Sequence, residues 1–544
     1  MKEKTTEKPK LNRILKGNRV AEIDRRAIND GIDPLELMKN AGEGISRKIF
    51  RDYKDSGLKR SPRGLIVCGG GNNGGDGFVV ALGLLELGYN IKTFHIVPSG
   101  KLSQDSSHYY KKLVKKSDDT VIALDLKDDK SKKKFLDELA VSDFVLDAIF
   151  GTGFHGTEIK GQSREIIDLI NSEREKRSDI LIYSVDIPSG VDSDNGNVPG
   201  TAVRADKTIT FGCKKVGNIN FPGASYNGRI SIIDIGIPGK YYSRYEQIFE
   251  PEFEWVAEKI PKRQSWTYKH SVGKLLIVAG SVGYTGAAAM ACLGALRSGA
   301  GLVTLACPKS LNPVFEQKLT ETMTFPVAET KSGSLHFESL EDILRLSKEV
   351  DAMVVGPGIS REASTMHLIR ELLQKADIPV VLDADGLQAL CTPYEIEEGV
   401  NNKIPEMIIT PHPGELSSIM NIKKIKLEER IDINVEASRR FGAVSVLKGA
   451  RTVISGAVTY VNPTGNWGMA SAGTGDILTG IIGSLVCQGM ELLEAAVCGT
   501  YIHGLSADII SKKTSKTSLI ATDLLEGLKE VFLNIERIKY KKEK

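Results

Sequence analysis

The chain has 544 residues, which exceeds one ordinary hydrophobic core, so we expect roughly two to four domains. Hydrophobic residues make up 41% and charged residues 26%, as in typical soluble globular proteins. The formal net charge of +3 gives no strong electrostatic case for nucleic-acid binding. Basic residues are dense in the tails, 1–16 and 537–544, which we expect to be solvated.

The seven cysteines are scattered and include no Cys-x-x-Cys pair, which favours a reducing compartment over a disulfide framework or a zinc site. The N-terminal segment lacks the apolar core of a signal peptide, and no uncharged apolar stretch reaches about 18 residues. We therefore expect a cytoplasmic protein without a membrane partner.

The first half alternates short apolar runs with amphipathic segments, which predicts a mainly parallel α/β sheet. The predicted strands are Leu65–Cys68, Ile91–Val97, Phe144–Ile149, Leu181–Val185, Thr208–Phe211 and Ile230–Ile235. The predicted helices are Val20–Asp30, Leu35–Phe50, Val79–Leu87 and Gln162–Arg174.

The second half repeats this pattern without repeating the motif order, so we predict two different domains. The predicted strands are Leu275–Ala279, Leu302–Ala306, Ala352–Val355, Val380–Leu382, Met407–Thr410, Ala443–Leu447 and Thr452–Ser455, and long helices follow Asp476. Gly239–Ile260 shows no strand pattern, and we place the boundary there, giving domains 1–245 and 246–544.

A glycine-rich loop, Gly69–Gly77, follows the strand Leu65–Cys68 and contains Gly-x-Gly-x-x-Gly. This string is a dinucleotide-binding fingerprint only when an acid ends the next strand, and here that strand ends His95-Ile96-Val97-Pro98. The loop therefore favours phosphate binding, but not the usual hydride-transfer arrangement.

Two later strands also end in an acid followed by a tight turn, at Asp147 and at Asp186. Ligands bind where the carboxyl ends of parallel strands share one edge, so these acids and Asp76 are predicted to converge. Such oxygen donors suit a hard cation. The alternative for each single Asp is a turn or cap residue.

The run Ala472-Gly473-Thr474-Gly475-Asp476 leads into a predicted helix, Ile477–Val486. A helix amino end with free N–H groups favours an anion such as phosphate. A carboxylate at that point is suited to take a proton from a hydroxyl that attacks the phosphate. The alternative for Asp476 is a helix N-cap.

Further turns cap the other strands of this half, at 279–288, 356–358, 383–387 and 410–415. His412 lies among them and is predicted to contact substrate, although a lone loop histidine is more often structural. The turn Lys448–Thr452 is either a plain hairpin or a nucleotide-binding loop, and it is not a Walker motif.

Residues 12–240 resemble the NAD(P)HX epimerase domain through Val20–Asp24, the Asn-Asn-Gly-Gly-Asp-Gly loop, Asp147–Gly153 and Asp186–Gly190. This family interconverts the R and S forms of hydrated NADH and NADPH. The resemblance implies K⁺ ligands at Asn73, Asp147 and Ser189, and substrate contact at Asp186. The implied substrate loops comprise Asn72, Asn73, Gly74, Gly75, Asp76, Gly151, Thr152, Gly153, Phe154, His155, Gly156 and Thr157.

The hydrated carbon is a hemiaminal-like centre, whose inversion needs reversible loss of water or ring opening. Either route requires an acid and a base. We expect Asp186 in that role, with Lys215, which matches a family lysine, as its helper.

Residues 261–524 resemble the ribokinase-like NAD(P)HX dehydratases through Gly-Pro-Gly, Thr-Pro-His-Pro-Gly-Glu, Lys-Gly-Ala-Arg-Thr and Ala-Gly-Thr-Gly-Asp. The sequence departs from the family at Asp-Ala-Asp-Gly-Leu and at Ala472. The resemblance implies hydrate contacts at Ala287, Gly358, His412 and Asp476, and adenine-nucleotide contacts at Lys448, Gly449, Ala450, Arg451, Thr452 and Gly475.

The implied reaction is kinase-like. Asp476 deprotonates the hydroxyl of the S hydrate, the oxygen attacks the terminal phosphoryl group, and loss of phosphate restores NAD(P)H. Fused proteins of this family use ADP, giving AMP and phosphate, so we expect ADP rather than ATP, with Mg²⁺ and a homo-oligomeric state.

The leading hypothesis is therefore a bifunctional α/β repair enzyme with a Rossmann-like three-layer epimerase domain and a ribokinase-like dehydratase domain. The alternative is a ribokinase-like small-molecule kinase whose N-terminal domain only binds.

Overall fold

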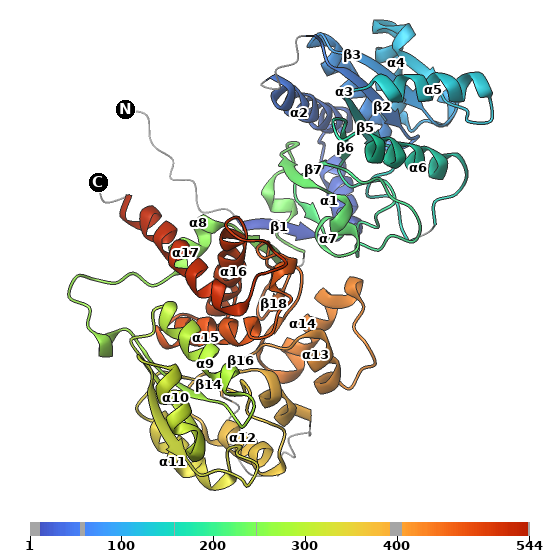
Figure 1. Cartoon of the computed structure of the whole chain (residues 1–544). Coiled ribbons are helices and arrows are strands. Elements are labelled where there is room, and N and C mark those ends of the chain that lie inside the picture. Colours follow the sequence, from blue (N-terminus) through green and yellow to red (C-terminus); the bar gives the residue numbers. More distant parts are fainter. Residues whose placement is uncertain (1–10, 55–59, 157, 246, 392–404, 542–544) are drawn as a thin grey trace. The chain divides into compact units, whose positions relative to one another are not determined.

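The computed structural model describes residues 11–54, 60–156, 158–245, 247–391 and 405–541 (Figure 1). Thr157, an expected substrate contact, lies outside these residues. The described residues form two compact units, one within Arg13–Gln247 and the other from Ile248 onward together with Leu11 and Asn12. No described helix is both long and apolar enough to cross a membrane.

The unit Arg13–Gln247 is built on a parallel sheet of seven strands in the order β4-β3-β2-β5-β6-β7-β9. The strands are β2 (Arg63–Cys68), β3 (Asn90–His95), β4 (Val121–Ala123), β5 (Phe144–Ala148), β6 (Leu181–Val185), β7 (Lys207–Phe211) and β9 (Arg229–Ile233). A short pair, β1 (Leu11–Leu15) with β8 (Lys214–Lys215), lies outside this sheet.

Helices cover both faces of this sheet, which makes three layers. The side chains of Ile66 and Cys68 on β2 pack with α2, α3 and α4, whereas Leu65 and Val67 pack with α5 and α6. The helices are α1 (Gly17–Asn29), α2 (Pro34–Lys54), α3 (Asn72–Glu86), α4 (Gln104–Lys116), α5 (Asp129–Val141), α6 (Gly161–Lys176) and α7 (Val216–Ile219).

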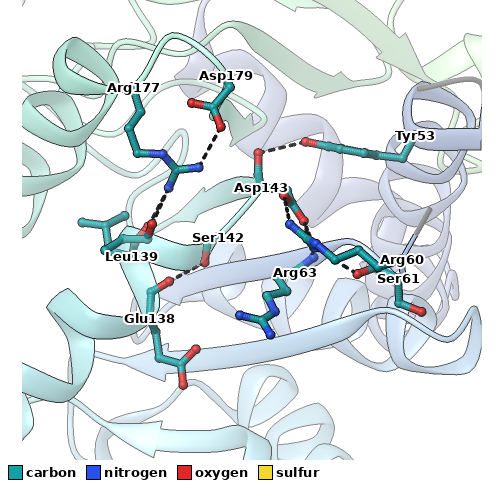
Figure 2. Close-up of polar contacts among 11 residues, drawn as sticks. Tyr53, Arg60, Ser61, Arg63, Glu138, Leu139, Ser142, Asp143, Arg177 and Asp179 are labelled. Atoms are coloured by element: carbon teal, nitrogen blue, oxygen red, sulfur yellow. Dashed lines mark hydrogen bonds and ion pairs between the residues drawn. The ribbon is translucent and has the colours of Figure 1, made fainter. Parts of the chain in front are cut away.

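A polar network around Asp143 holds the amino edge of this sheet, where β2 and β5 begin (Figure 2). The Asp143 carboxylate accepts two hydrogen bonds from Arg60, each 2.7 Å long, and one of 2.7 Å from the Arg63 backbone N–H. The Tyr53 hydroxyl donates to the Asp143 carbonyl at 3.0 Å. This network leaves the opposite, carboxyl edge to the residues with expected functions.

The second unit has a mixed sheet in the order β13-β12-β11-β14-β15-β16-β17-β18-β19-β10. Pairing is parallel except on the two sides of β18, which is antiparallel to β17 and β19. The strands are β10 (Ile248–Pro251), β11 (Lys274–Val278), β12 (Leu302–Pro308), β13 (Met323–Val327), β14 (Ala352–Val355), β15 (Val380–Leu382), β16 (Met407–Ile409), β17 (Val444–Leu447), β18 (Val453–Ser455) and β19 (Thr459–Val461).

One face of this sheet is covered by a core formed by α8, α9, α15, α16 and α17. Helices α9 and α15 approach each other closely at Gly480. A Cβ atom at this position would lie 2.0 Å from the Ala291 carbonyl oxygen, so the approach requires glycine. The helices are α8 (Phe253–Lys259), α9 (Thr285–Arg297), α10 (Asn312–Lys318), α11 (Leu340–Ser347), α12 (Ala363–Lys375), α13 (Pro413–Met420), α14 (Arg430–Phe441), α15 (Thr474–Cys487), α16 (Leu492–Ile510) and α17 (Ala521–Lys541).

The predicted α/β class is confirmed in both units, and two local predictions are wrong. Helix α3 begins at Asn72 rather than Val79, because the glycine-rich segment forms the first helical turns. Gly239–Ile260 contains β10 and α8, although it shows no strand pattern. A strand of four residues is too short for alternation to reveal, and pairing with β19 defines it.

Candidate functional sites

The carboxyl edge of the seven-stranded sheet begins with the loop between β2 and α3. A Cβ atom on Gly74 would lie 2.1 Å from the Gly69 carbonyl oxygen, so these two glycines serve the packing of the turn itself. A Cβ atom on Gly71 or on Gly153 would meet nothing within 4 Å. Open space therefore adjoins two of the loops that we expected to hold the substrate.

The three residues expected to bind K⁺ lie together at this edge. The fully buried Asp147 accepts hydrogen bonds from the Ser184 hydroxyl at 2.9 Å, the Ser189 N–H at 2.8 Å and the Ser189 hydroxyl at 2.5 Å. The Asn73 amide donates to the Phe150 carbonyl at 3.0 Å, and the Phe150 N–H donates to Ser189 Oγ at 2.8 Å. Burial raises the pKa of Asp147, and the Ser189 bonds oppose that rise.

The two predicted epimerase residues form a buried ion pair. Asp186 follows β6 with a left-handed backbone, φ 64°, and its carboxylate accepts from Lys215 Nζ and from the Thr210 hydroxyl at 2.8 Å. Lys215 has no solvent exposure, and it also donates to the Phe211 carbonyl at 3.1 Å. A non-glycine residue in this conformation marks strain that the surrounding structure maintains.

Two more carboxyl groups interact electrostatically with this pair. Burial, reinforced by the charges of Asp186 and Asp24, raises the pKa of Asp76 well above its usual value. Burial also raises the pKa of Asp24 to about 6, with Lys215 opposing and Asp186 adding to the rise. The sequence analysis did not assign Asp24 a role, although it stands four residues after the buried Val20 on one face of α1.

The second expected substrate loop of this unit, Gly151–Thr157, is partly exposed up to Gly156. The Thr152 carbonyl accepts from the Ser193 hydroxyl at 3.2 Å, and His155 Nδ1 lies 3.6 Å from Asp194 Oδ2. The Phe154 and Phe150 rings stack at a tilt, with centroids 5.8 Å apart. Contacts to Ser193 and Asp194 thus hold this loop against the segment that follows Asp186.

In the second unit, Asp476 lies in the first turn of α15, after the left-handed Gly473, φ 90°. Burial raises the pKa of Asp476 to about 7; the Asp383 carboxylate adds to the rise, and Lys448 opposes it. A carboxylate that is half ionised near neutral pH is suited to general-base catalysis. The helix amino end beside it favours an anion.

The Lys448 ammonium lies beside the same helix end. Its Nζ is 2.6 Å from Asp383 Oδ1 and 3.8 Å from Glu415 Oε2, and a Cβ atom on Gly475 would lie 3.6 Å from it. The ends of β15, β17, α13 and α15 therefore converge on one charged cluster.

Arg430 stabilises the turn Lys448–Thr452 through hydrogen bonds to its backbone, a role that the sequence did not reveal. Its buried guanidinium donates to the carbonyls of Leu447 at 3.1 Å, Lys448 at 3.2 Å and Ala450. Burial lowers the pKa of Arg430 to about 10. Within this turn, Arg451 is ion-paired with Glu250 at 3.1 Å.

His412 is both a helix cap and a neighbour of the charged cluster. Its Nδ1 accepts from the N–H groups of Gly414 at 3.0 Å and Glu415 at 3.1 Å, at the start of α13. This arrangement leaves Nε2 as the nitrogen that carries the proton. Nδ1 thus has a structural role as the helix cap, and Nε2 lies 3.4 Å from Glu415 Oε1.

Ala287 and Gly358, two expected hydrate contacts, are adjacent. A Cβ atom on Gly358, which has a left-handed φ of 61°, would lie 3.1 Å from the Ala287 Cβ and 2.7 Å from the Tyr284 carbonyl oxygen. The Ser281 hydroxyl donates to the Gly358 carbonyl at 2.8 Å.

Comparison with known proteins identifies both units. A family model described as NAD(P)H-hydrate dehydratase matches residues 275–530, and one described as YjeF-related protein N-terminus matches residues 34–217. Over 527 residues the chain is 37% identical to the bifunctional NAD(P)H-hydrate repair enzyme Nnr of Moorella thermoacetica, a match that covers 95% of this chain and 96% of that protein. The chain belongs to the bifunctional NAD(P)H-hydrate repair enzymes.

This repair enzyme therefore combines an NAD(P)HX epimerase with an NAD(P)HX dehydratase, as its motifs predicted. A relative of the same name from Thermofilum pendens is 35% identical over 522 residues, covering 94% of this chain and 95% of that protein. The ADP/ATP-dependent NAD(P)H-hydrate dehydratase of Bacillus subtilis, co-crystallised with ATP/Mg²⁺, is 29% identical, with a TM-score of 0.46. That match covers 52% of this chain and 97% of the Bacillus chain.

Proposed function

We propose that each activity of this repair enzyme resides at the cluster described for its unit, with dehydration at Asp476 and epimerisation at Asp186 and Lys215. The observation that supports the dehydratase site best is the position of Asp476. Its carboxylate stands at the amino end of α15 beside Lys448, and its pKa is raised to about 7.

In the dehydratase site, Asp476 takes the hydroxyl proton of the S hydrate, and the oxygen attacks the terminal phosphoryl group of ADP. The N–H groups of Gly473–Gly475 and the Lys448 ammonium stabilise the charge on the transferred group. AMP leaves, and the C–O bond to the phosphate then breaks, which releases inorganic phosphate. The adjacent ring carbon loses a proton to solvent, and this forms the ring double bond of NAD(P)H. His412 Nε2, Ala287 and Gly358 would contact the hydrate.

The nucleotide would lie along the turn Lys448–Thr452, as the motif resemblance implies, and we propose ADP as the phosphoryl donor. In the described part of this unit, no three His, Cys, Asp or Glu side chains form a group that fits a metal. Mg²⁺ would therefore arrive with the phosphate oxygens of the nucleotide, which it binds in many phosphoryl-transfer sites. It would neutralise phosphate charge there.

In the epimerase site, Asp186 and Lys215 exchange the proton that accompanies loss and return of the hydroxyl group. Lys215 supplies a proton to the leaving oxygen, and Asp186 accepts one when water returns to either face of the ring. Asp76 belongs to the loop Asn72–Asp76 that would hold the substrate, and burial raises its pKa. In its protonated form this carboxyl would donate a hydrogen bond to the substrate.

The K⁺ expectation for Asn73, Asp147 and Ser189 fits the residues present, because the three side chains and the Phe150 carbonyl form one hydrogen-bonded cluster that contains carboxylate, hydroxyl and carbonyl oxygens. K⁺ would supply positive charge for substrate oxygens at this edge. We expect Ser189→Ala to weaken K⁺ activation of epimerisation, measured as the K⁺ concentration that gives half-maximal rate. An unchanged K⁺ dependence would contradict this assignment. Homo-oligomerisation and a cytoplasmic location stay predictions.

A mixture of R and S hydrated NADH, with K⁺, Mg²⁺ and ADP or ATP, tests both sites through the absorbance of restored NADH. We expect full recovery with the wild type and a loss of about 100-fold or more in dehydration rate with Asp476→Asn. Asp186→Asn should limit the fast recovery to the S fraction. Asp385→Asn, a change near the dehydratase site in a residue paired with Arg361, is the matched control.

Recovery at the wild-type rate in Asp476→Asn would overturn the proposed dehydratase base. Recovery without any nucleotide would overturn the phosphoryl-transfer step. Fast recovery of the R fraction in Asp186→Asn would overturn the proposed epimerase pair.

A further inference from the structure

Asp383 is a buried carboxylate to which the proposed mechanism gives no role. It follows β15, and only 1% of its side chain is exposed. One carboxylate oxygen accepts from Lys448 Nζ at 2.6 Å, and the other accepts from the Thr479 hydroxyl, which lies on α15 one turn beyond Asp476. Asp383 thus joins the end of β15 to both the nucleotide turn and the helix that carries the proposed base.

The backbone holds Asp383 in this position. A Cβ atom on Gly356 would lie 1.9 Å from the Asp383 carbonyl oxygen, so the Gly-Pro-Gly turn packs directly against it. The next residue, Ala384, has a left-handed φ of 51°. Strain of this kind persists where the surrounding structure requires one geometry, and it concentrates at functional sites.

The contact with Asp383 determines where the Lys448 charge is placed. The lysine side chain is long and flexible, and 19% of it is exposed, so a partner is needed to restrict its ammonium group. Burial alone would lower the pKa of Lys448, but the carboxylates of Asp383 and Glu415 raise it. The ammonium therefore stays protonated, and it stays beside Gly475.

The charged groups that face Asp476 are Asp383 at the end of β15, Lys448 at the end of β17 and Glu415 on α13. The buried His503 on α16 is also close enough to Lys448 to interact with it. Burial lowers the pKa of His503 to about 4, so this histidine is neutral at pH 7. Asp383 and Glu415 thus favour the protonated form of Asp476, and Lys448 favours the ionised form.

We propose that Asp383 is a positioning residue of the dehydratase, which holds Lys448 at the amino end of α15 and keeps Asp476 a sufficiently strong base for the substrate hydroxyl. This inference rests on the proposed role of Asp476. Asp383 itself touches neither substrate nor nucleotide in this mechanism, and it acts through Lys448 and through its own charge.

The proposal predicts pH shifts of opposite sign for two variants. Asp383→Asn removes a negative charge near Asp476 and leaves the Lys448 charge uncompensated, and both effects lower the pKa of Asp476. The acidic limb of the kcat/KM profile for the S hydrate should therefore move about one unit to lower pH. Lys448→Met should move this limb to higher pH, because it removes the charge that favours the ionised form.

The profiles are measured with the full-length enzyme at saturating ADP and Mg²⁺, with Asp385→Asn as the matched control. Asp383→Glu, which keeps the charge, should restore most of the wild-type profile. If Asp383→Asn does not fold, the double variant Asp383→Asn/Lys448→Met leaves neither buried charge without a partner. Its acidic limb should then lie below that of Lys448→Met alone.

A second readout does not depend on activity. Acetic anhydride labels neutral lysine amines, and peptide mass spectrometry measures labelling at Lys448. In Asp383→Asn the labelling rate should rise about tenfold for each unit by which the Lys448 pKa falls. Asp385→Asn should leave it unchanged.

A folded Asp383→Asn enzyme with an unmoved acidic limb and unchanged Lys448 labelling would overturn the proposal. Faster labelling of Lys448 with an unmoved acidic limb of the kcat/KM profile would support the effect of Asp383 on the Lys448 ammonium. It would overturn the role of Asp476 as the base. Faster labelling together with a limb at lower pH would support both.

Discussion

At the scale of single residues, the two sites share one electrostatic arrangement. Each contains a buried aspartate–lysine pair at a strand end, Asp186 with Lys215 and Asp383 with Lys448. In each, a neighbouring carboxyl group has a raised pKa because of burial, Asp76 in one and Asp476 in the other. Since the lysine compensates one carboxylate, the second is left available for proton transfer.

The buried Asp186–Lys215 pair predicts that unfolding free energy and epimerase activity respond differently to substitutions. Lys215→Met leaves the buried Asp186 charge without its partner, so we expect a loss of ~3–5 kcal/mol in unfolding free energy. The double variant Asp186→Asn/Lys215→Met removes both charges and should recover most of that stability while remaining inactive in epimerisation. Chemical denaturation measures the first effect. A double variant no more stable than Lys215→Met would contradict this account.

At the scale of secondary-structure elements, the ends of strands and helices carry the chemistry. The carboxyl ends of β5 and β6 place Asp147 and Asp186 at one edge of a parallel sheet, and the first turns of α3, which follows β2, bring Asp76 to the same edge. In the other unit, the close packing of α15 against α9 presents the amino end of α15 to the strand ends. The opposite edge of the first sheet carries the Asp143 network, which ties the starts of β2 and β5 together (Figure 2).

The Asp143 network predicts a pH-dependent contribution to stability. Burial alone would raise the pKa of Asp143, but the hydrogen bonds from Arg60 and from the Arg63 backbone lower it below its usual value. A lowered pKa means that the stabilisation is present at neutral pH and is lost as the pH falls through the native-state pKa, below about 4. Asp143→Ala should therefore cost ~1–3 kcal/mol at pH 7 and progressively less below pH 4.

Thermal denaturation at several pH values measures this effect. Arg60→Met is the milder comparison, because half of the Arg60 side chain is exposed and solvent screens its ion pair with Asp143. Both enzyme activities should be unaffected at 25 °C, since the network lies at the edge away from the site. A loss of epimerase turnover without a change in melting temperature would contradict this assignment.

At the scale of the whole molecule, each unit has its own hydrophobic core and its own candidate site. The core clusters around β2 and around α1 draw only on the unit Arg13–Gln247, and the cluster around α15 only on the other unit. A unit with its own core is expected to fold by itself.

We therefore predict that separate fragments, 13–247 and 248–544, each retain one activity. The first should epimerise hydrated NADH, and the second should restore NADH from the S form in the presence of ADP. An equimolar mixture of the two should then recover both epimers, which the absorbance of NADH measures. A fragment that is folded by circular dichroism but inactive would show that its site needs the other unit.

The amino-acid sequence by itself determined the α/β class, most strands of both sheets and the positions of the acids at the strand ends. These features depend on local patterns, namely apolar runs, glycine-rich turns and the residue that follows a strand. The short strands β1, β4, β8, β10, β13 and β19 escaped prediction because their pairing, rather than a hydrophobic pattern, defines them.

Only the tertiary structure decided which charges meet. Asp383 and Lys448 are 65 residues apart, and the order β14-β15-β16-β17 of the sheet brings their strand ends together. Asp24 comes within electrostatic range of Lys215 because α1 packs against the rest of its unit. Arg430, on α14, supports the turn Lys448–Thr452. Burial then raises the pKa of Asp476 to about 7, and burial arises only when distant segments pack together.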